Sequence, residues 1–403
     1  MKPEEQRDVL ERIREEDVVA LAGELVRIPS HYQVPGGETG VARHIGDYLE
    51  SRGITSRVRE VFDGRSNVYG TLEGDRPGPT LLFCGHMDTV LPEGMVHPPF
   101  GAELRDGMLW GRGAVDMKGG LAAMLVAMAA LNETGVSLAG TLGFAGVVGE
   151  ESPNNSEGAR ALVQDWPVVD LAVVGEPTDL NVAVYHKGMT WLRVHVGGKA
   201  GHASHPEDGI NAIVVASRII ARLQDQLVPV LASRSHPYVS GPTLSIGRIE
   251  GGIQNNIIPD SCWFSLDRRI MPGEQQAEVI REIEEVADDV VRAFPGASFQ
   301  IEEQPETAGR GPMESGPGRL SRAFSSCGLS VTGTRLPVTG VDYWTDGTHL
   351  FRAGAETVVF GPGSISQAHS AEEFISVSQM TQAARLYALA AMRLLSHDPE
   401  ENL

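Results

Sequence analysis

Apolar and polar positions follow two spacings along the chain, one typical of strands and one of helices. Short apolar runs bounded by turn residues predict buried strands at 55–61, 67–72, 79–85, 140–148, 171–174 and 357–360. Apolar residues three and four positions apart predict helices at 4–27, 40–52, 119–131, 156–164, 317–327 and 377–395, with a further helical segment around 344–352. This alternation of strands and helices indicates an α/β fold, with a mostly parallel sheet flanked by helices.

The pattern changes near Lys187. Residues 190–196 (TWLRVHV) alternate apolar and polar positions, as a strand with one exposed face should. The elements predicted next are a helix at 209–226, strands at 243–250 and 260–268, a helix at 274–293 and a strand at 297–303. This β-α-β-β-α-β order is the ferredoxin-like unit. We therefore expect an inserted domain at 188–304 and a first domain made of 1–187 plus 305–403.

Composition and charge narrow the class of protein. The chain has 403 residues and a net charge of −20, which argues against nucleic acid or an anionic membrane as partner. No run approaches the roughly 18 apolar residues of a membrane span, and residues 1–17 contain no apolar signal core. We therefore expect a cytoplasmic globular protein. Cys84, Cys262 and Cys327 are too widely spaced for a zinc-binding pair and predict small buried side chains.

Acidic and imidazole side chains gather where the predicted strands of the first domain end. Three strands run into GHMD, GEE and GEP, and another acidic residue opens the helix at 119–131. In an open α/β sheet this edge is where ligands bind. Singly, paired glutamates are usually solvated and a loop histidine usually lies on the surface. Their coincidence at successive strand ends favours a site, whose candidate members are His86, Asp88, Asp116, Glu150, Glu151, Glu176 and His369.

The donors in this set are oxygens and imidazoles, with no thiolate. Such a set suits zinc, cobalt or manganese rather than a Cys-type structural site. Asp116 could bridge two ions, with His86 and Glu176 on one and Glu151 and His369 on the other. Two ions about 4 Å apart can clamp a hydrolytic water and a scissile carbonyl. The pattern therefore predicts a metal-dependent hydrolase.

Two carboxylates remain beside this predicted ligand set. Glu150 is adjacent to a ligand but is not needed as one, so it is the candidate general base. Asp88 would accept the second N–H of His86 and so fix the tautomer of that ring.

In chain order, the strings GHMDTV, GRGAVDMKGG, VVGEES, VVGEPT and GPGSISQAHSAEEF resemble the di-zinc amidohydrolase and peptidase family. That family includes N-acetylornithine deacetylase, succinyl-diaminopimelate desuccinylase, aminoacylase and glutamate carboxypeptidase. The resemblance covers nearly the whole chain. It implies the same five metal ligands, base and orienting acid, usually with two zinc ions. It also implies a cis peptide bond between Asp116 and Met117.

The inserted domain carries further matches to the family. In GHASHPEDGINAI, the resemblance implies that His202 reaches the partner subunit's active site and polarises the scissile carbonyl. This role implies a homodimer that packs through the insertion, which would act as a lid and dimerisation domain. In GGIQNNIIPD and LDRRIMPGE, Asn256 and Arg269 match the family's substrate-binding Asn and carboxylate-binding Arg.

Three of these assignments have alternatives. His205 is a lower-ranked rival of His202, and Arg268 a lower-ranked rival of Arg269. The turn formed by Gly361, Pro362 and Gly363 would offer backbone N–H groups to the substrate carboxylate, or it is simply a tight turn.

The expected activity is hydrolysis of a small N-acyl-L-amino acid. The resemblance favours a deacetylase because Glu176 stands where the family's peptidases usually carry Asp, and because the C-terminal motifs resemble N-acetylornithine deacetylases. Trp344 and residues 347–349 depart from that pattern, which puts the side-chain pocket in doubt. The alternative is a dipeptidase or glutamate-type carboxypeptidase with the same di-metal centre. A catalytically dead relative is disfavoured because all six ligand and base positions are filled. A nucleotide-binding α/β protein is excluded because no GxGxxG or P-loop sequence follows a strand.

Overall fold

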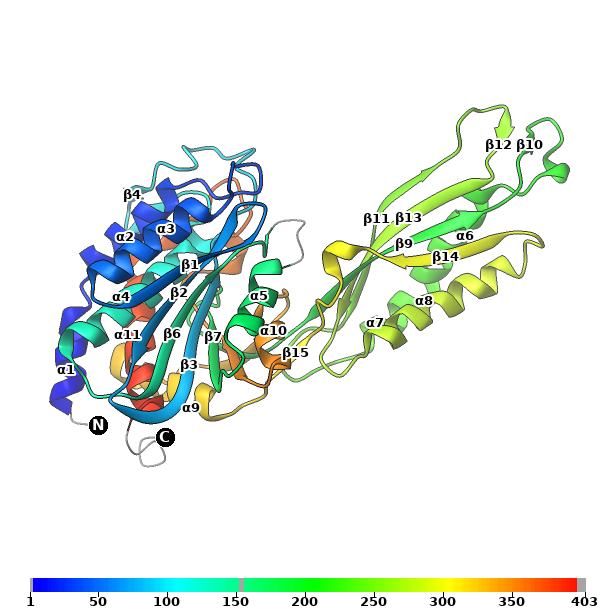
Figure 1. Ribbon diagram of the computed structural model, residues 1–403. Helices are drawn as coiled ribbons and strands as arrows, with labels where there is room; N and C mark the ends of the chain where they lie inside the picture. Colours follow the sequence, from blue (N-terminus) through cyan, green and yellow to red (C-terminus); the bar gives the residue numbers. More distant parts are fainter. Residues whose placement is uncertain (1–2, 152–155, 397–403) are drawn as a thin grey trace. The chain divides into compact units, whose positions relative to one another are not determined.

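The computed structural model describes residues 3–151 and 156–396 and shows two compact units (Figure 1). Unit 2 contains Tyr185–Glu314 and Val341–Trp344, and the rest of the chain forms unit 1. The second boundary falls ten residues after the predicted one, at 314 rather than 304. The backbone explains this difference, because residues 304–310 bond to the first strand of unit 2: Gln304 N donates to Trp191 O and Met189 N to Arg310 O.

One nine-stranded sheet runs in the order β1-β2-β6-β3-β7-β17-β8-β15, with β16 beside β8. Its strands are β1 Thr55–Phe62, β2 Arg65–Glu73, β3 Arg76–His86, β6 Ala139–Val147, β7 Leu171–Val174, β8 Val182–His186, β15 Met313–Glu314, β16 Val338–Val341 and β17 Glu356–Val359. The central strands β6, β3, β7 and β17 are parallel, whereas the flanking pairs are antiparallel. The predicted mostly parallel sheet is therefore confirmed. Its central strands are almost continuously apolar because helices cover both faces.

Two groups of helices cover this sheet (Figure 1). One face carries α2 Glu15–Arg27, α3 Thr39–Ser51, α4 Gly119–Thr134, α9 Arg319–Val331 and α11 Val377–Leu394, and the other carries α5 Glu157–Asp165 and α10 Gly347–Arg352. The prediction of a single helix at 4–27 is wrong, because the structure has two helices there. The break lies between α1 Pro3–Arg12 and α2, since Arg14 adopts an extended conformation.

Helix α4 lies at the centre of unit 1. Its residues are buried from Gly119 to Leu131, and it packs against α11 and α2. The segment Ala114–Thr134 is long and apolar enough to cross a membrane, but it is wholly buried. A helix that is apolar on every side belongs inside a core. A small sheet of β4 Glu103–Arg105, β5 Met108–Trp110 and β18 Phe374–Ser376 was not predicted, because three residues are too few to show a period.

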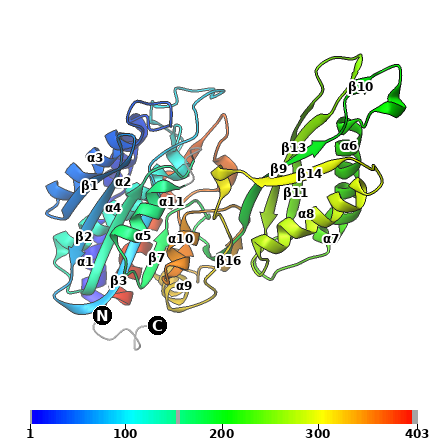
Figure 2. The same cartoon turned by 45° about the vertical axis from the view of Figure 1, so that its right-hand side comes forward.

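Unit 2 has the predicted ferredoxin-like order (Figure 2). Its elements are β9 Gly188–Gly197, β10 Gly201–His202, α6 Ala212–Arg222, α7 Val228–Ala232, β11 Thr243–Gly251, β12 Ile257–Ile258, β13 Ser261–Ile270, α8 Gln276–Val291 and β14 Ser298–Glu303. The antiparallel sheet runs β11-β13-β9-β14, and α6 and α8 cover one of its faces. Alternate residues of β9 (Leu192, Val194 and Val196) enter that core. This burial explains the alternation seen in the sequence.

Candidate metal centre

Three of the central parallel strands, β3, β6 and β7, end at the same edge of the sheet, and the predicted site lies there. His86 is the last residue of β3, Glu150 follows β6 and Glu176 follows β7. These strands are parallel neighbours, so their carboxyl ends meet. Asp116 joins them from the turn before α4, which begins with Gly113 in a left-handed conformation (φ 79°). The peptide bond between Asp116 and Met117 is cis.

Asp116 lies between two imidazoles. Its Oδ1 is 2.9 Å from Nε2 of His86, and its Oδ2 is 3.2 Å from Nε2 of His369. The His86 Nε2 also lies 3.4 Å from Glu176 Oε1, and the His369 Nε2 lies 2.5 Å from Glu151 Oε1. The structure thus brings all five predicted ligands together, in the two groups that the sequence predicted and with one aspartate common to both.

Asp88 is buried behind this set and holds two of its parts. Nδ1 of His86 lies 3.0 Å from the backbone oxygen of Asp88 and 3.5 Å from its Oδ1. The same carboxylate accepts the backbone N–H groups of Glu150 (3.2 Å) and Glu151 (2.9 Å). Since carbonyl and carboxylate oxygens only accept, Nδ1 of His86 carries a proton, and Nε2, which faces Asp116, is the ring atom placed to bind a metal ion. Asp88 therefore orients a histidine and also fixes the strand end that bears Glu150.

Buried charge dominates the electrostatics of the site. Burial, with the charge of Asp116, raises the pKa of Glu151 to about 8. Burial also raises the pKa of Glu176 well above its usual value. Hydrogen bonds to Asp116 and Glu151 raise the pKa of His369 to about 11. The carboxylates of Asp116, Glu151 and Glu176 lie so close together that positive charge is needed beside them. Bound protons supply this charge when no cation is present.

This donor set fits divalent cations. Ligand atoms of His86, Asp116 and Glu151 lie within 4.8 Å of one another. Divalent cations would supply the missing positive charge and leave the imidazoles neutral, the state in which they bind metal. Oxygen and imidazole donors without thiolate are typical of catalytic zinc and of similar ions.

Comparison with known proteins bears directly on this site. Residues 82–393 match the family described as Peptidase family M20/M25/M40. The chain belongs to this family. Its members hydrolyse amide bonds with metal ions, so this protein is an amide hydrolase of the M20 family. The predicted resemblance is confirmed.

Individual relatives in the M20 family differ in substrate. The chain is 28% identical over 394 residues to an N-formyl-4-amino-5-aminomethyl-2-methylpyrimidine deformylase of Halalkalibacterium halodurans (91% of this chain, 92% of the relative). It is 30% identical over 350 residues to an acetylornithine deacetylase of Myxococcus xanthus (85% and 88%). Its fold matches a dinuclear metal binding M20 peptidase of Bacillus subtilis with a TM-score of 0.74, at 18% identity (96% and 99%). These relatives act on different substrates, and identities of 28–30% leave the substrate of this protein open.

Sequence reasoning missed a buried ion pair that supports the site. Arg65 binds both carboxylate oxygens of Glu38, and these side chains are 8% and 0% exposed. Oε1 of Glu38 accepts the N–H of Gly149 at 3.0 Å, and Nη2 of Arg65 lies 3.9 Å from Asp88. We call Glu38 and Arg65 the strand-end clamp. No signal marked it beforehand, because the two residues lie in a turn and at a strand start, remote from every motif.

A second missed pair fixes the turn that carries Asp116. Oε1 of Glu373 accepts the backbone N–H groups of Val115 (3.1 Å) and Asp116 (3.3 Å). Its Oε2 accepts a hydrogen bond from Arg112 at 2.5 Å. Both residues stand inside the recognised strings GRGAVD and SAEEF, so membership of a motif was the available signal.

Three other predicted functional residues, His202, Asn256 and Arg269, lie in unit 2. His202 forms part of β10 and is exposed, as is Asn256, whose oxygen accepts the N–H of Ala203. Arg269 is partly exposed on β13, whereas its rival Arg268 is fully buried. A buried Arg268, bonded to an acidic neighbour in unit 2, acts as a structural residue. The ranking of Arg269 above Arg268 therefore agrees with their environments.

The glycine turn predicted to bind substrate has its N–H groups engaged. Gly361 N donates to Thr178 Oγ1 at 3.1 Å, and Gly363 N donates to Gln379 Oε1 at 2.6 Å. A Cβ at Gly361 would lie 2.4 Å from the oxygen of Gly175, so glycine is required for close packing beside Glu176. The tight-turn interpretation fits these contacts, because the N–H groups of Gly361 and Gly363 already have acceptors within the protein.

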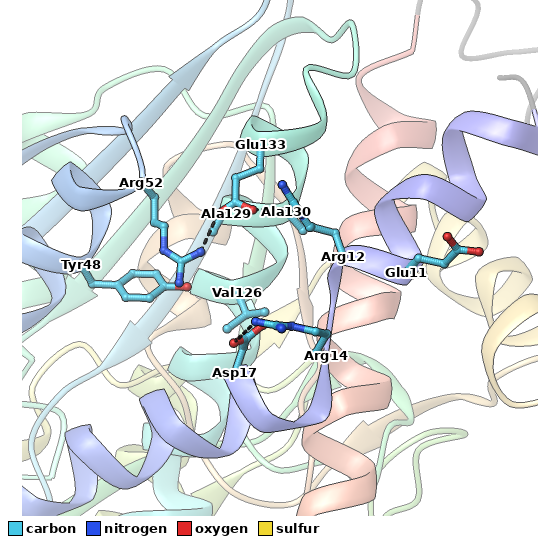
Figure 3. Close-up of a pocket in the computed structure, with 10 residues that line it drawn as sticks. All are labelled: Glu11, Arg12, Arg14, Asp17, Tyr48, Arg52, Val126, Ala129, Ala130 and Glu133. Carbon is cyan, nitrogen blue, oxygen red and sulfur yellow. Dashed lines mark hydrogen bonds and ion pairs between the residues drawn. The ribbon is translucent and has the colours of Figure 1, made fainter.

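A polar pocket of about 190 Å³ lies among α1, α2, α3 and α4 (Figure 3). Figure 3 shows Arg52 facing Glu133 and Arg14 facing Asp17. Arg12 also pairs with Glu133 at 2.8 Å, and Arg14 pairs with Asp17 at 2.8 Å. Arg12 and Arg52 thus share the carboxylate of Glu133, and Arg14 has that of Asp17. The pocket is an ion-pair network that joins the first helices to α4, and we assign it no ligand.

Proposed function

We propose that this M20 hydrolase removes the acyl group from an N-acyl-L-amino acid with a di-metal centre. The observation that carries the proposal is Asp116, which lies between two imidazole–carboxylate pairs at the edge where Glu150 follows β6. Relatives described as a deformylase, a desuccinylase and acetylornithine deacetylases, which all remove small acyl groups from amines, support the deacylase assignment.

The proposed cofactor is a pair of zinc ions, with cobalt or manganese as alternatives. His86 and Glu176 would hold one ion, Glu151 and His369 the other, and Asp116 both. When bound, such ions polarise the scissile carbonyl and lower the pKa of a bound water.

The protein's own residues would manage the protons. Glu150 takes a proton from the attacking water and returns it to the leaving amine, which makes it both general base and general acid. Asp88 keeps Glu150 in place through the backbone N–H of that residue. Asp88 also holds His86 as the tautomer whose Nε2 is unprotonated.

Substrate recognition is assigned to unit 2. Arg269 would bind the substrate carboxylate and Asn256 would contact the amide. Nε and Nη2 of Arg269 are held by Asp267, at 2.9 and 3.2 Å. This pairing fixes the plane of the guanidinium, and Nη1, whose contact is the weak acceptor Sδ of Met189 at 4.0 Å, would turn to the substrate. The partner subunit's His202 would polarise the scissile carbonyl.

The proposed homodimer packs through unit 2. Within the residues that the structure describes, β11 pairs on one side only, with β13, and is an edge strand. Ile249 on β11 is 52% exposed and Ile253 in the following loop 84%, with Val214 of α6 also exposed. An edge strand with apolar neighbours is suited to pairing with a second copy of the same strand.

The alternative activity uses the same centre on peptides. Relatives of similar identity are described as probable carboxypeptidases, which supports a dipeptidase or carboxypeptidase. A cytoplasmic location is part of the proposal and rests on the sequence alone.

A substrate panel tests the class. Protein loaded with zinc, cobalt or manganese is expected to release acyl acid from one of the N-acetyl-, N-succinyl- or N-formyl-amino acids, and a chelator should abolish turnover. Release of acyl acid is measured beside a panel of dipeptides. Cleavage of dipeptides alone would favour the alternative, and turnover that survives the chelator would contradict the di-metal assignment.

The carboxylate assignment predicts a difference between adjacent arginines. Arg269→Gln should raise KM by about 10- to 100-fold with a smaller change in kcat, since it removes a charged contact that substrate makes throughout the reaction. Arg269→Lys should recover part of this loss. Arg268→Met, the comparison variant, should instead lower Tm and leave KM near the wild-type value. Equal KM for the wild type and Arg269→Gln would reject the assignment.

A further inference from the structure

His202 belongs to a short chain of hydrogen bonds in the loop after β10. Its Nδ1 lies 2.6 Å from Ser204 Oγ and 3.2 Å from the backbone nitrogen of Ser204. Ser204 Oγ also lies 2.9 Å from Nδ1 of His205. The backbone holds this loop, because His205 N donates to His202 O (2.9 Å) and His202 pairs with Ile257.

The backbone contact sets the direction of the whole chain. A peptide N–H can only donate, so Nδ1 of His202 must accept and carries no proton. The neutral ring then has its proton on Nε2. The hydroxyl of Ser204 has one proton, which it donates to Nδ1 of His202, and its oxygen is free to accept Nδ1–H of His205. Read this way, every atom of the chain has a compatible partner.

We infer that Ser204 and His205 are positioning residues, which hold His202 as the neutral Nε2–H tautomer. Nε2 is then the only donor of that ring, and a carbonyl oxygen that gains negative charge needs such a donor. The inference rests on the proposed function, which gives His202 this contact with substrate. It also assigns a role to His205, which the sequence offered only as a rival of His202.

The tautomer can be measured without turnover. The protein, with its 12 histidines labelled with ¹⁵N, is studied by NMR at alkaline pH. The signals of His202 are identified by their loss in His202→Asn. We expect an unprotonated Nδ1 and a protonated Nε2. A ring protonated on Nδ1, or two tautomers in equal amounts, would overturn the inference whatever the substrate.

Kinetics then tests the effect of the chain on the reaction. Ser204→Ala should lower kcat about 5-fold, the value of one hydrogen bond, with KM unchanged, and Ser204→Thr should restore it. His205→Ala should lower kcat by less than Ser204→Ala does. His205→Asn should restore kcat, because the amide N–H of asparagine can replace Nδ1–H of the histidine. His195→Ala removes a partly exposed histidine of β9 and should not change kcat.

The outcomes separate the two proposals. Suppose that NMR finds the Nε2–H tautomer but His202→Ala keeps the wild-type kcat. The hydrogen-bond chain is then as inferred, and the role of His202 in catalysis is rejected. If His202→Ala loses most of its kcat while Ser204→Ala and His205→Ala keep the wild-type value, only the positioning role is rejected.

Discussion

Glu150→Gln is expected to lower kcat by about 10²- to 10⁴-fold while both metal ions remain bound. Gln keeps the size and the backbone contact with Asp88 but cannot take a proton from water, so only the acid–base function is lost. The measurement combines kcat on the substrate found in the panel with the metal content of the purified variant. Because the loss lies in the proton transfer, KM should change little.

Two comparisons make this test specific. Glu157→Gln changes a partly exposed glutamate at the start of α5 and should leave kcat unchanged. Glu151→Gln should instead reduce metal content, because Glu151 faces His369 in the proposed ligand set. A Glu150→Gln variant that loses metal would make Glu150 a ligand, and one with normal kcat would remove it as the base.

The sequence predicted the parts of this protein that periodicity and local order determine. The apolar run of β3 and the alternation of β9 each define a strand and its burial. The order of parallel strands places His86, Glu150 and Glu176 at one edge, so a candidate site follows from strand ends alone. The break between α1 and α2 was missed because apolar periodicity continues across it.

The supporting contacts could not be predicted in the same way. Glu38 and Gly149 are 111 positions apart in the sequence. Arg65 meets Glu38 only because α3 packs against β2. No local pattern encodes such a pairing, because many sequences with the same periodicity would place other residues there. The contacts of Gly361 and Gly363 likewise arise from tertiary packing, which only the three-dimensional structure reveals.

The strand-end clamp should be necessary for both stability and catalysis. Arg65→Met leaves the carboxylate of Glu38 buried without a counter-ion, and breaking a buried pair in this way typically costs about 3–5 kcal/mol. The Glu38 side chain is fully buried, and this burial raises its pKa. We expect a lower free energy of unfolding, measured in urea, together with a lower kcat.

Two double variants separate these effects. Glu38→Leu/Arg65→Met removes both buried charges, so much of the stability should return, but Gly149 N–H has lost its acceptor. Its kcat should therefore stay at least about 10-fold low, since the residue before Glu150 is no longer fixed and only Asp88 still holds the base. Glu38→Gln/Arg65→Met retains an amide oxygen for that N–H and should recover more of kcat at similar stability. Equal, wild-type kcat in both would show that the clamp supports the fold without positioning the base.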